Sequence, residues 1–177
     1  SVLLFLVLGT ILTLVLQSSS ATMALTIMML NFGWIHFDMA CAMVLGENIG
    51  TTITANIAAS VGNTSAKRSA LAHTVFNVFG VVWALIFFGL FLKLIGAITS
   101  GLFGLPNPAA EGFEIVEGTK NADGKIVQTA SQTAALYGLS MLHTLFNTIN
   151  TIILIWFIPQ IEKLVCRIIK NKKEDEK

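Results

Sequence analysis

Two short polar segments interrupt long apolar stretches of this chain. Gln17-Ser18-Ser19-Ser20 lies in the middle of the stretch from Val2 to Leu30, and Gly46 to Thr52 lies in the middle of Phe37 to Val61. Each stretch is long enough to cross a bilayer as one helix, since about 20 apolar residues suffice. Hydrocarbon offers no water to polar groups, so such interruptions persist mainly where protein or a wet cavity surrounds them. The sequence therefore predicts a break in each stretch, either a discontinuous span or a re-entrant hairpin, and marks both as candidate solute sites.

Composition supports an all-α integral membrane protein. Of the 177 residues, 54% are hydrophobic and only 12% are charged. Eleven Lys and Arg against ten Asp and Glu give a net charge of +1, which does not indicate nucleic-acid binding. Cys41 lies in an apolar segment and Cys166 in a basic one, so we expect neither a disulfide nor a zinc site. Because the chain starts without Met and is apolar from Val2 onward, we expect it to be a fragment.

Charge along the chain predicts how it crosses the membrane. Ser69 to Ile95 and Leu136 to Ile158 are further spanning candidates, and Pro159 closes the second. Basic residues adjoin the start of the first and the end of the second: Lys67, Arg68, Lys163, Arg167, Lys170, Lys172 and Lys173. Two crossings return the chain to its starting side, and basic segments stay inside, so we expect both clusters in the cytoplasm. Thr99 to Thr133 then lies outside.

This topology divides the chain into four parts. We expect a transmembrane repeat over residues 1–98, an extracytoplasmic connection over 99–133, a transmembrane helix over 134–160 and a cytoplasmic basic tail over 161–177. Within the connection, the turn signal at Asn121 to Gly124 predicts a small hairpin. The protein is predicted to be a multi-pass plasma-membrane protein with its C-terminus in the cytoplasm.

The segment Gln17 to Ser20 has the chemistry of an anion site. A helix that begins at this point inside the membrane presents unpaired N–H groups and the positive end of its dipole, and the serine hydroxyls add donors. The same serine oxygens, with free carbonyls at the break, could coordinate Na⁺. The alternative is that small hydroxyl residues only allow close helix packing. Four adjacent polar positions face every side of a helix, which disfavours a shared packing seam.

The segment Gly46 to Thr52 is open to two interpretations. Asn48, Thr51 and Thr52 supply oxygen atoms that can bind or support Na⁺. However, Gly46 and Gly50 form a GxxxG spacing, which also favours plain helix packing. Glu47 is an ionisable group at membrane depth, where it must be paired, protonated or in contact with a cation.

Two His-Asn pairs at helical spacing are predicted to be structural. Asn77 follows His73, and Asn147 follows His143, by four residues. We expect these pairs to form hydrogen bonds across helices rather than to relay protons or bind a metal. The stretches Leu71 to Asn77 and Met141 to Asn147 also resemble each other, and the predicted topology uses them in opposite orientations, which indicates inverted symmetry.

The sequence resembles the type II sodium/phosphate cotransporter family, in particular its bacterial branch. The resemblance rests on Gln17 to Thr22, on Gly46 to Thr52 and on the two His-Thr-x-Phe-Asn stretches, and it extends from Leu4 to Pro159. It implies one of two inverted repeats, here the second, with inorganic phosphate and the coupling ion Na⁺ bound between the repeats. By this resemblance Gln17, Ser18, Ser19 and Ser20 bind phosphate, and Ser19, Ser20, Asn48, Thr51 and Thr52 bind or support Na⁺. Glu47 departs from the Ala that is frequent at this position.

The family also implies partners. These are the first repeat of the same transporter, the lipid bilayer and, in many bacterial members, a cytoplasmic domain similar to the phosphate regulator PhoU; no cofactor other than Na⁺ is implied. Two other functions compete with transport. The chain could be a regulatory or assembly subunit linked to phosphate sensing. It could also be an intramembrane hydrolase that uses a serine with His73 or His143, but it lacks a GxSxG elbow and an evident acidic partner. We therefore expect no enzyme activity.

Overall fold

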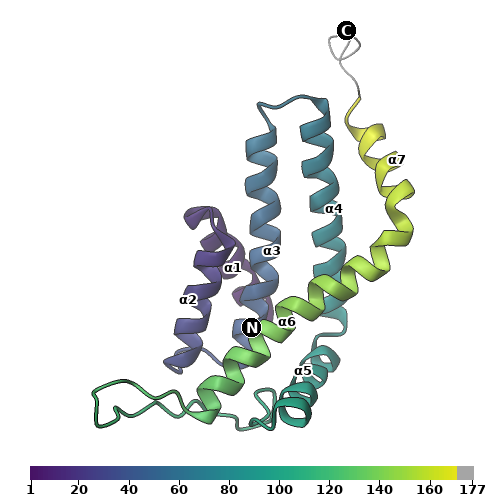
Figure 1. The fold of residues 1–177 in the computed structure, drawn as a ribbon. Coiled ribbons are helices and arrows are strands. Elements are labelled where there is room, and N and C mark those ends of the chain that lie inside the picture. Colours follow the sequence, from purple (N-terminus) through teal and green to yellow (C-terminus); the bar gives the residue numbers. More distant parts are fainter. Residues whose placement is uncertain (171–177) are drawn as a thin grey trace.

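The computed structural model of the protein describes residues 1–170, and Lys172 and Lys173 of the predicted basic tail lie outside them. The described part is helical, as predicted, and its only β pairing is an isolated bridge between Lys120 and Ile126 beside the predicted turn. Figure 1 shows the elements in order: α1 Val2–Leu16, α2 Ser19–Asn31, α3 Phe37–Ala59, α4 Thr64–Ile86, α5 Phe88–Phe103, α6 Ala130–Leu154, a 3₁₀ turn Ile155–Phe157, and α7 Ile158–Ile168.

The first polar segment breaks the helix, as predicted. α1 ends at Leu16 and α2 begins at Ser19, so Gln17 and Ser18 form a tight turn between two short helices that run in opposite directions. Figure 1 shows that this turn reaches only part of the way along α3. The stretch from Val2 to Leu30 is therefore a helical hairpin.

The predicted break in the second segment is wrong, because α3 runs unbroken through Gly46 to Thr52. Its polar side chains bond to carbonyls of their own helix: the amide of Asn48 donates to Val44 (3.0 Å), and the hydroxyl of Thr51 donates to Glu47 (2.8 Å). The hydroxyl of Thr52 likewise donates to Ile49 over 2.8 Å. Such bonds satisfy the polar groups without unwinding the helix.

The glycines of α3 serve close packing against α1, which was the alternative interpretation. A Cβ at Gly46 would meet the carbonyl oxygen of Leu6, and one at Gly9 of α1 would meet that of Met43. Thr10 of α1 also donates to the Gly46 carbonyl over 3.0 Å. The order of these contacts makes α1 and α3 parallel, with α2 antiparallel to both.

Within residues 1–170, two helices are long and apolar enough to span a membrane, Thr64–Ile86 and the combined stretch Ala130–Ile168. The predicted span Ser69 to Ile95 is wrong at its end, because the chain turns at Phe87 into α5, whose Phe91 and Ile95 enter the core. The predicted span Leu136 to Ile158 likewise differs: a capping box of Thr129 and Gln132 starts α6 earlier. Pro159 lies in the first turn of α7 and so begins a helix instead of closing one.

The core lies where α3, α4, α5 and α6 meet. Trp83 of α4 packs between Phe91 of α5 and Phe146 of α6, with ring centroids 5.6 and 5.9 Å away. Asn150 of α6 is fully buried, donates to the Phe76 carbonyl over 2.9 Å and accepts from the Trp83 indole over 3.2 Å.

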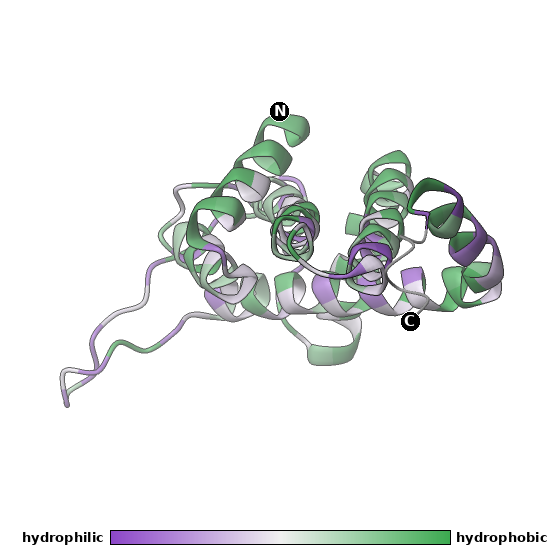
Figure 2. Ribbon diagram, turned by 90° about the horizontal axis from the view of Figure 1, so that it is seen from above, coloured by the Kyte–Doolittle hydropathy of each residue, from purple (hydrophilic) through white to green (hydrophobic). Residues whose placement is uncertain are grey.

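Figure 2 shows α1 and α2 on one side of α3, with α4 and α7 on the other. The hairpin and α7 therefore occupy opposite flanks.

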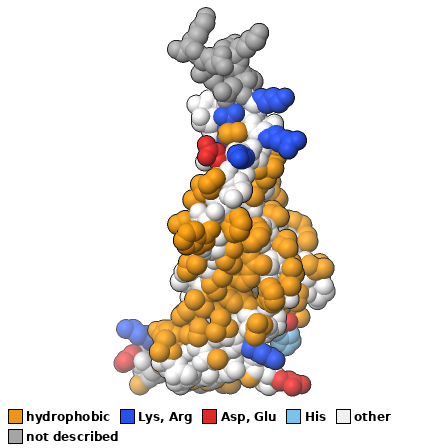
Figure 3. Space-filling view, turned by 90° about the vertical axis from the view of Figure 1, so that its right-hand side faces the viewer, with side chains coloured by type: hydrophobic (Ala, Val, Ile, Leu, Met, Phe, Trp, Pro, Cys, Tyr) orange, Lys and Arg blue, Asp and Glu red, His pale blue; other side chains and the backbone are white. Residues whose placement is uncertain are grey.

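Charged side chains gather at the two ends of the molecule. Figure 3 shows a broad hydrophobic band between them, and Lys and Arg crowd the end formed by α7. Arg68, near the start of α4, donates from Nε to the carbonyl of Ile169 just beyond α7 over 2.9 Å. The two described basic clusters therefore lie at the same end. The connection before α6 lies at the opposite end (Figure 1).

Candidate functional site

The turn between α1 and α2 has a left-handed residue that is not glycine. Gln17 has φ 51° and ψ 28°, and among residues 1–170 it is the only non-glycine residue with positive φ. Ser18 is extended and caps α2, since its Oγ accepts from the Ala21 N–H over 3.2 Å. Its carbonyl accepts from both the N–H and the hydroxyl of Thr22, each over 3.1 Å. Ser18 thus holds the break in shape.

The other polar side chains of the turn are open to a solute. Gln17, Ser19 and Ser20 are exposed, and no hydrogen bond within the described part of the chain engages their side chains. The N–H groups of Ser19 and Ser20 lie in the first turn of α2, where no helical carbonyl precedes them. Two free hydroxyls, two amide N–H groups and one carboxamide can therefore contact an anion at this point.

A string of buried polar side chains supports the break from within. Thr13 of α1 lies 3.2 Å from the hydroxyl of Thr22 of α2, and the hydroxyl of Thr26 donates to Glu47 of α3 over 3.1 Å. The three threonines are at most 1% exposed and Glu47 is 3% exposed. The first of these bonds joins the two helices of the hairpin, and the second joins the hairpin to α3. The sequence signal for this contact is the spacing of Thr22 and Thr26, which places both on one face of α2 and was not used to predict it.

Asn48, Thr51 and Thr52 of α3 lie close to the hairpin, but among residues 1–170 their side chains make no hydrogen bond to it. Gly50 packs against Thr13, one turn before Gln17, which places α3 beside the last turn of α1. Asn48 and Thr51 are partly exposed, whereas Thr52 is fully buried. Among residues 1–170 no hydrogen bond joins these three side chains to Gln17 or to the serines that follow it.

The two His-Asn pairs bond within their own helices. Asn77 donates to the His73 carbonyl over 3.0 Å, and Asn147 donates to the His143 carbonyl over 2.8 Å. Other asparagines make the bonds between helices: Asn150, described above, and Asn56, which donates to the Thr74 hydroxyl over 2.6 Å. In the described part of the chain, neither imidazole is hydrogen-bonded to a serine or a carboxylate.

The sequence profile of the Na⁺/Pi-cotransporter family matches residues 2–105, which is more than half of the chain. The chain belongs to this family. The matched region contains the break at Gln17 and Ser18, the buried threonines and all of α3. The resemblance noted from the motifs is thereby confirmed. Membership in this family, together with the two long apolar helices, indicates a membrane protein.

The curated relatives that this member of the Na⁺/Pi-cotransporter family matches are much longer than the chain itself. The uncharacterized protein YqeW of Bacillus subtilis (strain 168) is 45% identical over 82 residues, which are 46% of this chain and 27% of that protein. The human sodium-dependent phosphate transport protein 2C is 41% identical over 83 residues, 44% of this chain and 14% of that protein. The rat sodium-dependent phosphate transport protein 2B is 40% identical over 78 residues, which are 42% of this chain and 11% of that protein. No solved structure matches the chain significantly.

Proposed function

We propose that this chain forms part of a transporter that couples Na⁺ entry to the uptake of inorganic phosphate. The observation that carries the proposal is the break at Gln17 and Ser18. At this point the helix is interrupted between the apolar helices α1 and α2, and the side chains of Gln17, Ser19 and Ser20 are exposed. Relatives named sodium-dependent phosphate transport proteins support the same substrate and coupling ion.

The break presents two helix ends of opposite polarity. The first turn of α2 carries free N–H groups and the positive end of a helix dipole, which favour phosphate. The last turn of α1 carries free carbonyls and the negative end of a dipole, which favour Na⁺. We assign phosphate to Gln17, Ser18, Ser19 and Ser20, and Na⁺ to the α1 carbonyls with Ser19 and Ser20. Because no fixed cation takes part, phosphate can also be released readily.

α3 forms the wall behind these helix ends. We assign Asn48, Thr51 and Thr52 a supporting role for Na⁺. Asn48 and Thr51 are partly exposed, so a modest side-chain rotation frees an oxygen for the ion. Thr52 is buried and supports the wall through packing. His73, Asn77, His143 and Asn147 remain structural in this proposal.

The chain supplies one of two inverted repeats, and a second repeat completes the cavity. This proposal accords with the fact that the chain spans about a quarter or less of its curated relatives. Residues 1–98 form the repeat, 99–133 an extracytoplasmic connection, 134–160 a further transmembrane helix and 161–177 a cytoplasmic tail to which a PhoU-like domain can attach. The membrane potential drives uptake, since each net positive charge moved inward gains about 2.3 kcal/mol per 100 mV.

Membership in a transporter family supports a non-enzymatic role. A regulatory or assembly subunit linked to phosphate sensing would not need the open hydroxyls at the break. Transport therefore accounts for more of the observed geometry than either competing function.

Uptake of radiolabelled phosphate by proteoliposomes tests the proposal. The protein translated from the complete reading frame is reconstituted, and uptake is compared under an inward Na⁺ gradient and under an equal choline gradient. Accumulation only with Na⁺ is expected. Equal uptake with choline would reject Na⁺ coupling, and absence of uptake with both ions would reject transport.

A further inference from the structure

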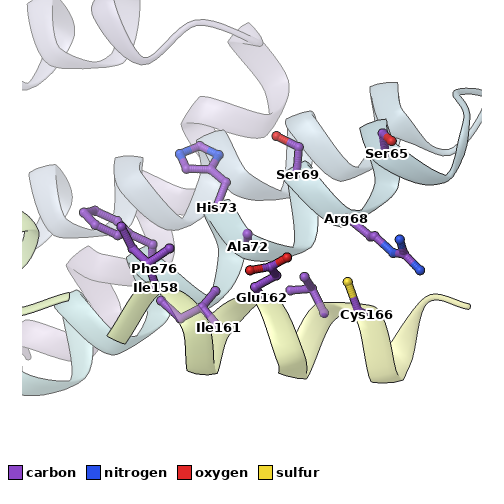
Figure 4. Close-up of a pocket in the computed structure, with 11 residues that line it drawn as sticks. Ser65, Arg68, Ser69, Ala72, His73, Phe76, Ile158, Ile161, Glu162 and Cys166 are labelled. Carbon is purple, nitrogen blue, oxygen red and sulfur yellow. The ribbon is translucent and has the colours of Figure 1, made fainter. Parts of the chain in front are cut away.

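One side of α7 packs against α4, and the other side is turned outward. The side that faces α4 carries Ile158, Ile161, Glu162 and Cys166 (Figure 4). Val165 lies on this same side and is only 4% exposed. Figure 2 shows α7 at one flank of the described helices. The outward side of α7 is therefore available to the surroundings of the protein.

Cationic side chains form a stripe on the outward side of α7. Lys163 and Arg167 each lie two residues from Val165, which places both about 160° around the helix from this buried residue. Lys170 follows just beyond the end of α7, and all three cationic side chains are exposed. Within residues 1–170, no ion pair or hydrogen bond engages these three side chains. Their positive charges are therefore available to an anion.

An apolar stripe runs beside the cationic one. Phe157 just before α7, and Leu164 and Ile168 within it, follow one another at spacings of seven and four residues, so they share one side of the helix. Their side chains are 49%, 43% and 59% exposed. Figure 3, which faces this flank, shows the hydrophobic band reaching the Lys and Arg side chains at α7. The surface therefore changes from apolar to cationic towards the basic end of the molecule.

An anionic phospholipid complements this change of polarity. Phe157 precedes Lys163 by six residues, so an acyl chain beside the apolar stripe brings the lipid phosphate to the cations further along α7. The carboxylate of Glu162 lies on the side that faces α4, outside the cationic stripe (Figure 4). Phosphatidylcholine and phosphatidylethanolamine carry an ammonium that the same cations repel, whereas phosphatidylglycerol has a net negative charge. The stripe therefore favours the anionic lipid.

We propose that the outward side of α7 binds an anionic phospholipid from the leaflet at the basic end of the molecule. The phosphate contacts Lys163 and Arg167, and an acyl chain lies along Phe157 and Leu164. An acidic protein segment would meet the cations but would leave the apolar stripe exposed. This lipid site lies apart from the break between α1 and α2 and does not depend on transport.

Native mass spectrometry of the detergent-purified protein with equimolar phosphatidylglycerol and phosphatidylcholine tests the site. We expect phosphatidylglycerol to be retained about tenfold better, equivalent to 1.4 kcal/mol. Each cation at a membrane surface is worth about fivefold, equivalent to about 1 kcal/mol, so Lys163→Gln/Arg167→Gln should remove the preference. Lys120→Gln/Lys125→Gln removes two exposed charges at the opposite end and is the matched control, which should keep it.

A measurement on the wild type keeps the test decisive if the charge variant fails to fold. The preference for phosphatidylglycerol should weaken as the concentration of ammonium acetate is raised, because salt screens exposed charges. Inorganic phosphate should not displace the lipid, since it cannot cover the apolar stripe. Equal retention of the two lipids, an unchanged preference in Lys163→Gln/Arg167→Gln, or displacement by inorganic phosphate would overturn the proposal. Absence of any retained lipid would also overturn it.

Discussion

The hydroxyl of Thr26 donates a hydrogen bond to the carboxylate of Glu47 over 3.1 Å, and this bond links α2 to α3. Both residues are buried, and neither α1 nor α2 contains a charged residue that could pair with Glu47. The same hydroxyl lies 2.9 Å from the carbonyl of Thr22 within α2, so its single hydrogen is shared between the two acceptors. The hydroxyl of Thr26 therefore contacts both a carbonyl of its own helix and the Glu47 carboxylate of α3.

Thr26→Val should destabilise the protein, because it removes this bond with little change of shape. Leaving a buried polar group without its partner costs about 1–3 kcal/mol. Denaturation of the purified protein by SDS, followed by circular dichroism, measures the loss. Thr26→Ser keeps the hydroxyl and should restore most of the stability. Thr151→Val is the control, because the exposed Thr151 side chain bonds only within α6. An equal loss of stability in both Val variants would contradict the role of the bond between Thr26 and Glu47.

Gly9→Ala should also destabilise the protein, because the new Cβ would meet the backbone of Met43 and push α1 away from α3. Overpacking of this kind typically costs about 1–3 kcal/mol. Gly101→Ala in α5 is the matched control, since nothing lies within 4 Å of its Cβ position. It should be neutral or stabilising by up to about 1 kcal/mol, because alanine favours helix. The same SDS denaturation assay compares the stability of the two variants. Wild-type stability in Gly9→Ala would mean that α1 and α3 pack less closely than described.

Substitutions at Gln17 can distinguish the effect of its left-handed backbone from the effect of its carboxamide on phosphate uptake. Its left-handed backbone costs a non-glycine residue about 1–2 kcal/mol, so Gln17→Gly should stabilise the hairpin. If the carboxamide binds substrate, the same variant should nevertheless lose phosphate uptake. Gln17→Asn keeps a shorter amide and tolerates this conformation, so it should retain partial uptake. Full uptake by the stable Gln17→Gly protein would show that the side chain does not act on substrate.

Ser18 should matter for stability in addition to its proposed contact with phosphate, because its side chain caps α2. Ser18→Ala removes the cap of α2 and should cost about 0.5–2 kcal/mol, whereas Ser18→Asp keeps a capping oxygen. Thermal unfolding followed by circular dichroism compares these variants with Ser20→Ala. Ser20 is exposed and makes no side-chain hydrogen bond among the described residues, so its replacement should leave the unfolding temperature unchanged. A loss for Ser20→Ala as large as that for Ser18→Ala would contradict this division of roles.

The helix break at Gln17 could be predicted from sequence because its causes are local. A run of polar residues in an apolar stretch, followed by a serine that can cap a helix, is visible in a few adjacent residues. The start of α6 had a local signal as well, the Thr129 and Gln132 capping box, which the prediction of a span from Leu136 did not use. Local signals therefore locate where a helix starts.

The course of α3 could not be predicted in the same way. Gly46 in isolation fits either an unwound segment or a packed one, and the carbonyl of Leu6, far away in sequence, decides between them. The roles of Asn150 and Glu47 also depend on residues in other helices, Phe76 and Thr26. The end of α4 at Ile86 is similar, since α5 turns away to bury Phe91 against Trp83. Contacts between distant segments determine these features.

The most direct test of the break as the transport site compares serine variants in Na⁺-driven phosphate uptake. Ser19→Ala/Ser20→Ala removes the two open hydroxyls, and Ser140→Ala removes an equally exposed hydroxyl from α6. We predict that the double variant loses at least about tenfold in uptake rate, equivalent to 1.4 kcal/mol, while Ser140→Ala transports normally. Uptake by the double variant at the wild-type rate would contradict the assignment of phosphate and Na⁺ to this break.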